Sequence, residues 1–159
     1  MMSAPLKIFL ALLRIAAGVS LLLAGLGKLS WFGSAQPLQA TFSDWMAKGH
    51  SPLIVKYVGF MQPHATALAR VVVLGELGLG ALLIIGFLTP IAAVLAFLVV
   101  LQFHFASGAW LAKTYVAPSG GLVYLLVFLV LFAGRAGQAL GLDGFIGRAV
   151  TGGSGPARK

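Results

Sequence analysis

The stretch VVVLGELGLGALLIIGFLTPIAAVLAFLVVLQFHF, residues 71–105, governs how this chain can be arranged. It is apolar almost throughout and contains one acid, Glu76. As a single helix it would be about 50 Å long, whereas the hydrocarbon core of a bilayer is about 30 Å thick. The chain must therefore fold back within this stretch. Thr89-Pro90 is the natural turn, because proline ends one helix and can start the next.

The composition of the whole chain also indicates a lipid environment. Of 159 residues, 60% are hydrophobic and only 9% are charged, against about 25% charged in a soluble domain. So few charges cannot cover the surface of a water-soluble protein, which indicates an integral membrane protein. Eleven Lys and Arg face three acids, for a net charge of +8. The basic residues stand singly between apolar runs without interleaved aromatics, which excludes nucleic acid as a partner and suits lipid headgroups.

Four apolar runs are long enough to span a bilayer, at about residues 6–26, 65–88, 91–111 and 121–138. They predict an all-α integral membrane four-helix bundle within residues 1–150. A cleaved signal peptide is the alternative for the first run. Arg14 interrupts its apolar core, and no small-residue cleavage site follows, so we do not favour cleavage.

The segment 31–63 is the one substantial piece between spans. Two helix starts, at Pro37 and at Ser51-Pro52, predict two short amphipathic helices on the membrane interface. The apolar face of the first would hold Leu38, Phe42, Trp45 and Met46. These helices form either a lid over the bundle or a simple interfacial connector. Residues 151–159, rich in Gly, Ser and Pro, are predicted to be a disordered tail.

Four spans place both termini on one side of the membrane. That side would carry Lys7, Arg135, Arg148, Arg158 and Lys159, and the other side Lys28, Lys48, Lys56 and Lys113. The bias is slight and favours cytoplasmic termini in a bacterial or archaeal inner (cytoplasmic) membrane.

Charged residues deep within the spans need a physical reason, since each costs roughly 2.5 to 3.5 kcal/mol to insert. Glu76 is predicted near the middle of the second span, among glycines that let another helix approach. A buried carboxylate takes a proton or finds a cation. Arg14, on the first span, is predicted to be that cation. It belongs to a stripe with 4, 3, 4, 3 spacing that ends at Lys28, which is expected to snorkel to the opposite interface.

Three further polar residues lie within the spans. His104 is placed on the third span, slightly toward the loop side, and Tyr124 at a similar depth on the fourth. Arg70 lies near the interface and is predicted to anchor the second span in the headgroups. A lone membrane histidine is more often a satisfied hydrogen-bonding group than a ligand, so both interpretations of His104 stay open.

This polar set has two interpretations. A buried ion pair could simply fix how the helices pack. Alternatively Arg14, Glu76, His104 and Tyr124 line a polar pocket for a small amphipathic molecule. A quinone fits, since its carbonyls need donors and its chain needs an apolar groove; Glu76 or His104 could carry the coupled protons. The chain has no cysteine and three widely separated histidines, so we expect no protein-held haem, iron–sulfur cluster or metal.

Several short motifs resemble one family of membrane proteins. The first span reads Leu13-Arg14, Gly18, Ala24-Gly25 and Lys28-Leu29; the second reads Gly75-Glu76-Leu77 through Gly86-Phe87-Leu88-Thr89-Pro90; the C-terminal part has Gly134-Arg135 and Leu142-Asp143. Over about residues 6–148 the chain resembles the DoxX family, which is related to the DoxD subunit of thiosulfate:quinone oxidoreductase. The resemblance implies a four-helix bundle and a link to quinone-dependent or sulfur-related redox complexes that respond to oxidative stress. Arg14, Lys28 and Glu76 are the matched polar positions.

Three functions therefore remain open. The chain could be a quinone-interacting subunit of a membrane oxidoreductase, with a partner supplying the electrons. It could be a non-catalytic accessory or scaffold subunit of a larger membrane complex. It could also be a small proton-coupled transporter with one membrane glutamate. In each case we expect membrane lipids, and other membrane subunits or a second copy of the chain, as partners, and no self-contained catalytic machinery.

Overall fold

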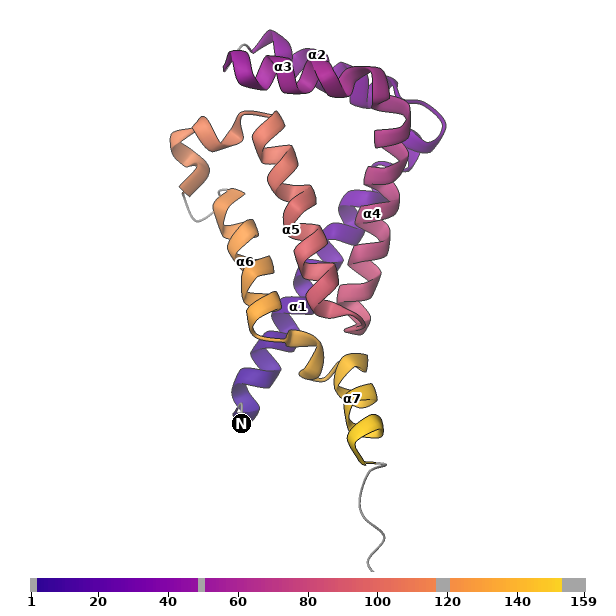
Figure 1. The fold of residues 1–159 in the computed structure, drawn as a ribbon, viewed down its shortest axis with the longest axis vertical. Coiled ribbons are helices and arrows are strands. Elements are labelled where there is room, and N and C mark those ends of the chain that lie inside the picture. Colours follow the sequence, from indigo (N-terminus) through magenta and orange to yellow (C-terminus); the bar gives the residue numbers. More distant parts are fainter. Residues whose placement is uncertain (1–2, 49–50, 117–120, 153–159) are drawn as a thin grey trace, which may run out of the picture.

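The computed structural model of the chain describes residues 3–48, 51–116 and 121–152, and all regular structure within these ranges is helical. The helices are α1 (Ala4–Leu26), α2 (Gln36–Ala47), α3 (Pro52–Met61), α4 (Ala65–Ile85), α5 (Thr89–Ala106), α6 (Gly121–Ala133) and α7 (Leu142–Gly152). Helices α1, α4, α5 and α6 form the bundle, α2 and α3 lie across one end, and α7 extends from the other (Figure 1). The predicted all-α membrane bundle with short helices between the first two spans is confirmed.

Four helical segments in the described part of the chain are long and apolar enough to cross a membrane. They are Ala4–Leu26, Pro52–Ile85, Thr89–Ala106 and a fourth whose described parts are Lys113–Val116 and Gly121–Ala133. The second combines α3 and α4, which are joined through a short 3-10 turn, η2 (Gln62–His64). Proline at position 63 lacks the amide hydrogen that a continuous helix needs. The helical path changes direction there, from lying across the end of the bundle to running along it (Figure 1).

Two spans end earlier than the sequence predicts. The third helix was expected to reach residue 111, but α5 ends at Ala106, and Gly108 turns the chain with a φ of 68°. The fourth was expected to reach residue 138, but α6 ends at Ala133. There Arg135 takes a left-handed conformation, with a φ of 45°, that no α-helix continues. The sequence remains apolar on both sides of these two turns, so composition alone does not show where α5 and α6 end.

The turn predicted at Thr89-Pro90 is confirmed. Helix α4 ends at Ile85 and is capped by Gly86, whose φ of 71° suits glycine, and α5 begins at Thr89 with proline in its first turn. The first amides of α5 have no partner within the helix. Asp143 of α7 accepts hydrogen bonds from the backbone N–H groups of Leu88, at 2.7 Å, and Thr89, at 2.9 Å. The C-terminal helix therefore caps α5.

Glycines bring α1 and α4 into backbone contact. A Cβ atom added at Gly18 would lie 2.8 Å from the carbonyl oxygen of Gly80, and one at Gly80 would lie 2.8 Å from that of Gly18. A Cβ atom added at Gly75 or Gly78 would meet no atom within 4 Å. Of the three glycines between residues 75 and 80, Gly80 is therefore the one that the α1 contact requires.

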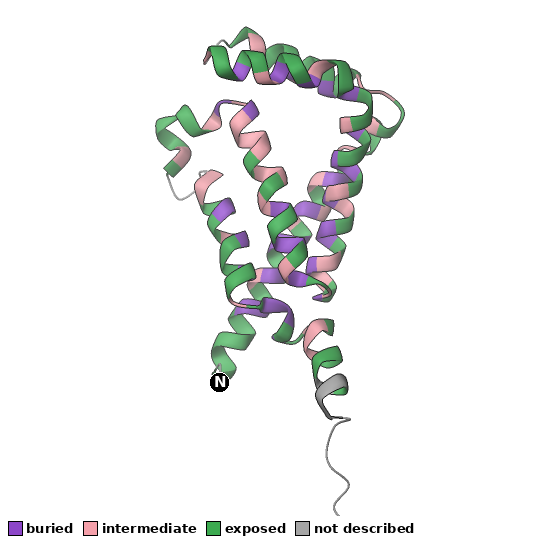
Figure 2. Ribbon diagram, viewed as in Figure 1, coloured by how far each residue is buried: buried purple, intermediate pink, exposed green. Residues whose placement is uncertain are grey.

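Two clusters of buried side chains hold the protein together. One lies within the bundle and includes Leu21, Leu83 and Phe128. The other joins α2 and α3 to α4 and α5, and consists of Leu38, Phe42, Ile54, Val58, Met61, Ala65, Ala69 and Ala106. Exposed residues cover much of the outside of the bundle (Figure 2), and many of them are large and apolar, as lipid-facing helices are.

Both ends of the described chain lie at the same end of the bundle, as four spans require (Figure 1). Helix α7 extends to Gly152, so residues 151 and 152 of the predicted tail are helical. The remainder of that predicted tail, residues 153–159, lies outside the described residues.

Candidate functional site

An ion pair joins the C-terminal end of α1 to the middle of α4. The ammonium of Lys28, just beyond α1, donates to both carboxylate oxygens of Glu76 on α4, at 2.5 and 2.7 Å. Glu76 is 6% exposed, and the Lys28 side chain is 26% exposed. Lys28 was expected to snorkel to the interface, but it turns inward instead. Bonding both oxygens to an ammonium is what makes a charged carboxylate tolerable at such a site.

The predicted pair of Glu76 with Arg14 is wrong, and the register of the two helices explains why. Gly18 packs beside Gly80, and Gly25 packs against Leu77, so Glu76 lies level with the last turn of α1. Arg14 is eleven residues before Gly25, or about 16 Å along the helix. It therefore lies level with the far end of α4. Depths counted from the ends of apolar runs do not show this register.

Arg14 instead binds the C-terminal segment. It is 1% exposed, and its Nη1 and Nη2 donate to the carbonyl oxygens of Ala136, at 3.3 Å, and Leu140, at 3.4 Å. Gly86 and Gly141 border its guanidinium so closely that an added Cβ atom at either would overlap it. Arg14 thus ties the segment after α6 to α1 and to the α4–α5 turn, as a structural residue.

A cavity of about 330 Å³ lies beside the Lys28–Glu76 pair. It brings together three of the four predicted pocket residues, Glu76, His104 and Tyr124, and adds Lys28; Arg14 is not among its lining residues. The apolar lining residues are Leu21, Ala24, Val99, Val100 and Phe103. Ser20 is the remaining lining residue and is polar. The cavity is therefore amphipathic, and α1, α4, α5 and α6 all contribute to it.

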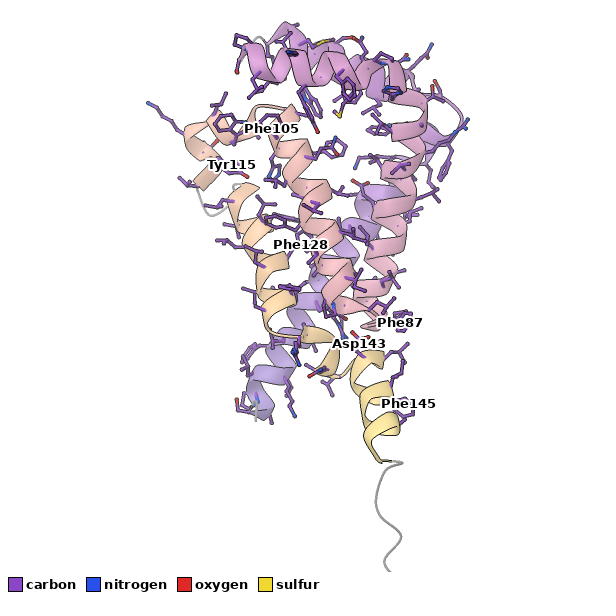
Figure 3. The ribbon with its side chains drawn as sticks, viewed as in Figure 1. Phe87, Phe105, Tyr115, Phe128, Asp143 and Phe145 are labelled. Atoms are coloured by element: carbon purple, nitrogen blue, oxygen red, sulfur yellow. The ribbon has the colours of Figure 1, made fainter. Side chains whose placement is uncertain are left out.

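His104 has a partner that the sequence did not reveal. Its Nδ1 lies 3.1 Å from the hydroxyl of Tyr115, and the two rings meet edge to face. Tyr115 belongs to the short turn η4 (Lys113–Val116) beyond α5, as Figure 3 shows. His104 also lines a second cavity, of about 280 Å³, with Tyr115 and Trp110. This hydrogen bond fixes the orientation of the imidazole at the boundary between the two cavities.

A family model confirms the resemblance seen in the sequence. The model for DoxX matches residues 9–107. The chain belongs to the DoxX family. It is an integral membrane protein. No curated protein and no solved structure matches it. The matched DoxX region holds Arg14, Lys28, Glu76 and His104, whereas Tyr124 lies beyond it.

Aromatic rings surround the cation of this DoxX site. The Lys28 ammonium lies 5.8 Å from the centre of the Trp31 ring and 5.9 Å from that of Phe103. Trp45 of α2 meets Phe103 edge to face, with ring centres 5.9 Å apart. Cation–π attraction adds to the ion pair where water is scarce. Helix α2 is thus linked through Trp45 and Phe103 to the wall of the cavity.

Two other polar side chains of the DoxX bundle, Arg70 and Gln102, are not among the lining residues of the cavity. Arg70 is exposed on α4, consistent with an interfacial anchor. Gln102 donates a hydrogen bond to the sulfur of Met61 at 3.3 Å. Within the described ranges, no three His, Cys, Asp or Glu side chains gather as a metal site would require.

The arrangement combines hydrogen-bond donors, proton carriers and an apolar wall. Lys28 has three N–H donors and uses two of them on Glu76, so one remains. Imidazole and carboxylate can each gain or lose a proton, and a tyrosine hydroxyl can donate or accept. Such a cavity suits a small molecule that has carbonyl oxygens and an apolar body.

Proposed function

We propose that this DoxX protein binds a quinone in the 330 Å³ cavity and acts as the quinone-interacting subunit of a membrane oxidoreductase complex. The observation that supports this most is the Lys28–Glu76 ion pair in the wall of an amphipathic cavity that His104 and Tyr124 also line. A purely structural ion pair would be expected to pack against side chains, without open space beside it.

The lining residues fit the chemistry of a quinone. Its carbonyl oxygens accept hydrogen bonds, which the remaining Lys28 donor and the His104 and Tyr124 side chains could supply. Val99 and Val100 offer an apolar surface to the ring and chain. The cavity volume lies at the lower end of the range of ligand pockets, about 300 to 1,000 Å³. That is room for a head group, with the chain lying along the helices toward lipid.

In this proposal the residues of the chain orient the head group and handle protons. A bound quinone would supply two-electron redox chemistry. Lys28 holds Glu76 in place, and Tyr115 holds the His104 ring. Glu76 and His104 can then give or take protons at the cavity wall. The electrons would come from a partner subunit of the complex, because this sequence has no cysteine with which to hold an iron–sulfur cluster.

The test is the quinone content of the purified protein. After extraction in a mild detergent, the wild type should retain about one quinone per chain, measured by chromatography of the extracted lipids. Glu76→Gln and His104→Ala should each lose most of it. Asp44→Asn is the matched control, because it also replaces a carboxylate by an amide and breaks a lysine ion pair, the exposed Lys48–Asp44 pair on α2.

Two outcomes would replace the proposal by another function. A wild-type protein that has no quinone, but that co-purifies in fixed ratio with a larger complex, would be an accessory subunit. Proton-driven uptake of a substrate into liposomes would indicate a transporter. Quinone retained equally by the wild type, Glu76→Gln and His104→Ala would place the quinone site elsewhere.

A further inference from the structure

A second cavity lies at the opposite end of the bundle, where the spans end near the termini. Its volume is about 590 Å³. It is formed by the first turn of α5, the last turn of α6, the turn that follows, η5 (Ala136–Gln138), and the first turn of α7. The lining residues are Pro90, Phe132, Ala133, Arg135, Gln138 and Asp143. None of them belongs to the proposed quinone site.

The lining of this cavity is divided into an apolar and a polar part. Pro90, Phe132 and Ala133 belong to the ends of spans, and Phe132 is 47% exposed. Arg135 and Gln138 follow α6 and are also exposed. A molecule that has an apolar part at the level of the helix ends and a polar part just beyond them matches this division. Phospholipids have that form at the membrane interface.

The charge of the cavity favours an anionic headgroup. Both oxygens of Asp143 already accept hydrogen bonds from the backbone of α5, which compensates this carboxylate. Arg135 takes part in neither of the two ion pairs formed among residues 3–48, 51–116 and 121–152. Its guanidinium is therefore available for a phosphate, which it can bind through two parallel hydrogen bonds.

The backbone also holds Arg135 in an unusual conformation. Three described residues other than glycine have a positive φ, namely Leu88, Arg135 and Leu140, and all three lie at this end of the bundle. Such conformations persist where the surrounding structure imposes them, and they cluster at functional sites. Figure 3 shows Asp143 at the foot of the bundle, beside the α4–α5 turn that it caps.

We propose that the cavity bordered by Arg135, Gln138 and Phe132 binds the headgroup of an anionic phospholipid from the leaflet on the side of the termini. Arg135 contacts the phosphate, Gln138 donates to its oxygens, and Pro90 and Phe132 contact the start of an acyl chain. This site is independent of quinone binding.

The test is lipid retention by the purified protein, measured by native mass spectrometry after addition of phosphatidylglycerol or phosphatidylcholine. The wild type should retain one phosphatidylglycerol in preference to phosphatidylcholine. Arg135→Gln should weaken that retention about fivefold, the effect of one basic side chain at an anionic membrane surface. Lys56→Gln is the matched control, because it removes an exposed basic side chain on α3, which lies across the opposite end of the bundle. Equal retention of both lipids by the wild type, or unchanged retention in Arg135→Gln, would overturn the proposal.

A second variant guards against misfolding. Arg135→Gly removes the guanidinium and suits a φ of 45° better than arginine does. It should therefore fold at least as well as the wild type, judged by helix content and gel filtration, and still lose the lipid. Inorganic phosphate in excess should leave the lipid bound. If free phosphate displaced the lipid, the cavity would be a phosphate site, which would refute the lipid proposal.

Discussion

Lys28, just beyond the first membrane helix, supplies the cation for the buried carboxylate of Glu76. The stem of Lys28 brings its ammonium to Glu76, and the two aromatic rings of Trp31 and Phe103 border it. A carboxylate that is 6% exposed among apolar helices would be costly without a cation. Pairing with Lys28 offsets that cost, and both side chains of the pair line the 330 Å³ cavity.

Removing one member of this pair should destabilise the protein more than removing both. Lys28→Met or Glu76→Gln leaves an unpaired polar group, at an expected cost of about 1 to 3 kcal/mol in unfolding free energy. The double variant should recover part of this loss. Denaturant unfolding in detergent, followed by circular dichroism, gives the coupling energy of the double-mutant cycle.

Arg14 offers the comparison for that experiment. Because it binds the carbonyl oxygens of Ala136 and Leu140, a cycle of Arg14→Gln with Glu76→Gln should be additive within about 0.5 kcal/mol. A coupling energy well above that value between Arg14 and Glu76, or none between Lys28 and Glu76, would contradict the observed pairing.

Among the helices, the contact between α1 and α4 positions the site. Gly18 and Gly80 let the two backbones touch, and this contact sets which residues of the two helices lie side by side. The Lys28–Glu76 pair is a consequence of that register. In lipid, such close packing of small residues replaces the hydrophobic driving force that is absent between membrane helices.

Replacing the contact glycine should have a different effect from replacing an open one. In Gly80→Ala the new methyl group would meet the backbone of Gly18 and Leu22 at 2.8 Å, so the helices must separate and the thermal stability should fall. Gly78→Ala on the same helix meets nothing within 4 Å and should be neutral or stabilising by about 0.5 to 1 kcal/mol. Thermal unfolding in detergent compares the two, and equal effects would show that the α1–α4 contact is not tight.

The same two variants should also differ in quinone content. Gly80→Ala moves Glu76 away from Lys28 and should reduce bound quinone, whereas Gly78→Ala should retain it. A Gly80→Ala protein that is folded and keeps full quinone would show that the proposed site does not depend on this register.

At the level of the complete bundle, basic residues are found toward both ends. On the loop side, Lys28 and Lys48 are paired with Glu76 and Asp44, whereas Lys56 and Lys113 take part in neither of these ion pairs of the described residues. On the side of the termini, the sequence has Lys7 and Arg135 and adds Arg148, Arg158 and Lys159 toward its C-terminus. Through the positive-inside rule, this slight excess favours cytoplasmic termini, which we propose.

Cysteine labelling tests this orientation without background, because the sequence has no cysteine. Ser3 and Ser43 are both exposed, near the start of α1 and on α2. In intact cells with a permeabilised outer membrane, an impermeant maleimide should label Ser43→Cys but not Ser3→Cys, and after lysis it should label both. The reverse pattern would invert the orientation. Labelling of both variants in intact cells would contradict their placement on opposite sides.

Local composition was enough to predict the helices and their lipid environment. The length of residues 71–105 exceeds the bilayer, so a turn had to fall within it, and proline 90 marks the position. Starts at Pro37 and Ser51-Pro52 likewise agree with α2 and α3. These features depend on the chain itself and on lipid, since apolar length and backbone chemistry act within a few turns of helix.

The partners of the charged residues depended on contacts between distant segments. Glu76 and its candidate pocket partners His104 and Tyr124 could be named from their rarity in apolar spans, and they do line one cavity. That Lys28, and not Arg14, reaches Glu76 follows from the contact of Gly18 with Gly80, and Arg14 is held by carbonyl oxygens more than 120 residues away. A shift of one helix along another changes every such pairing while leaving each helix as it is, so this choice is made only when the helices pack.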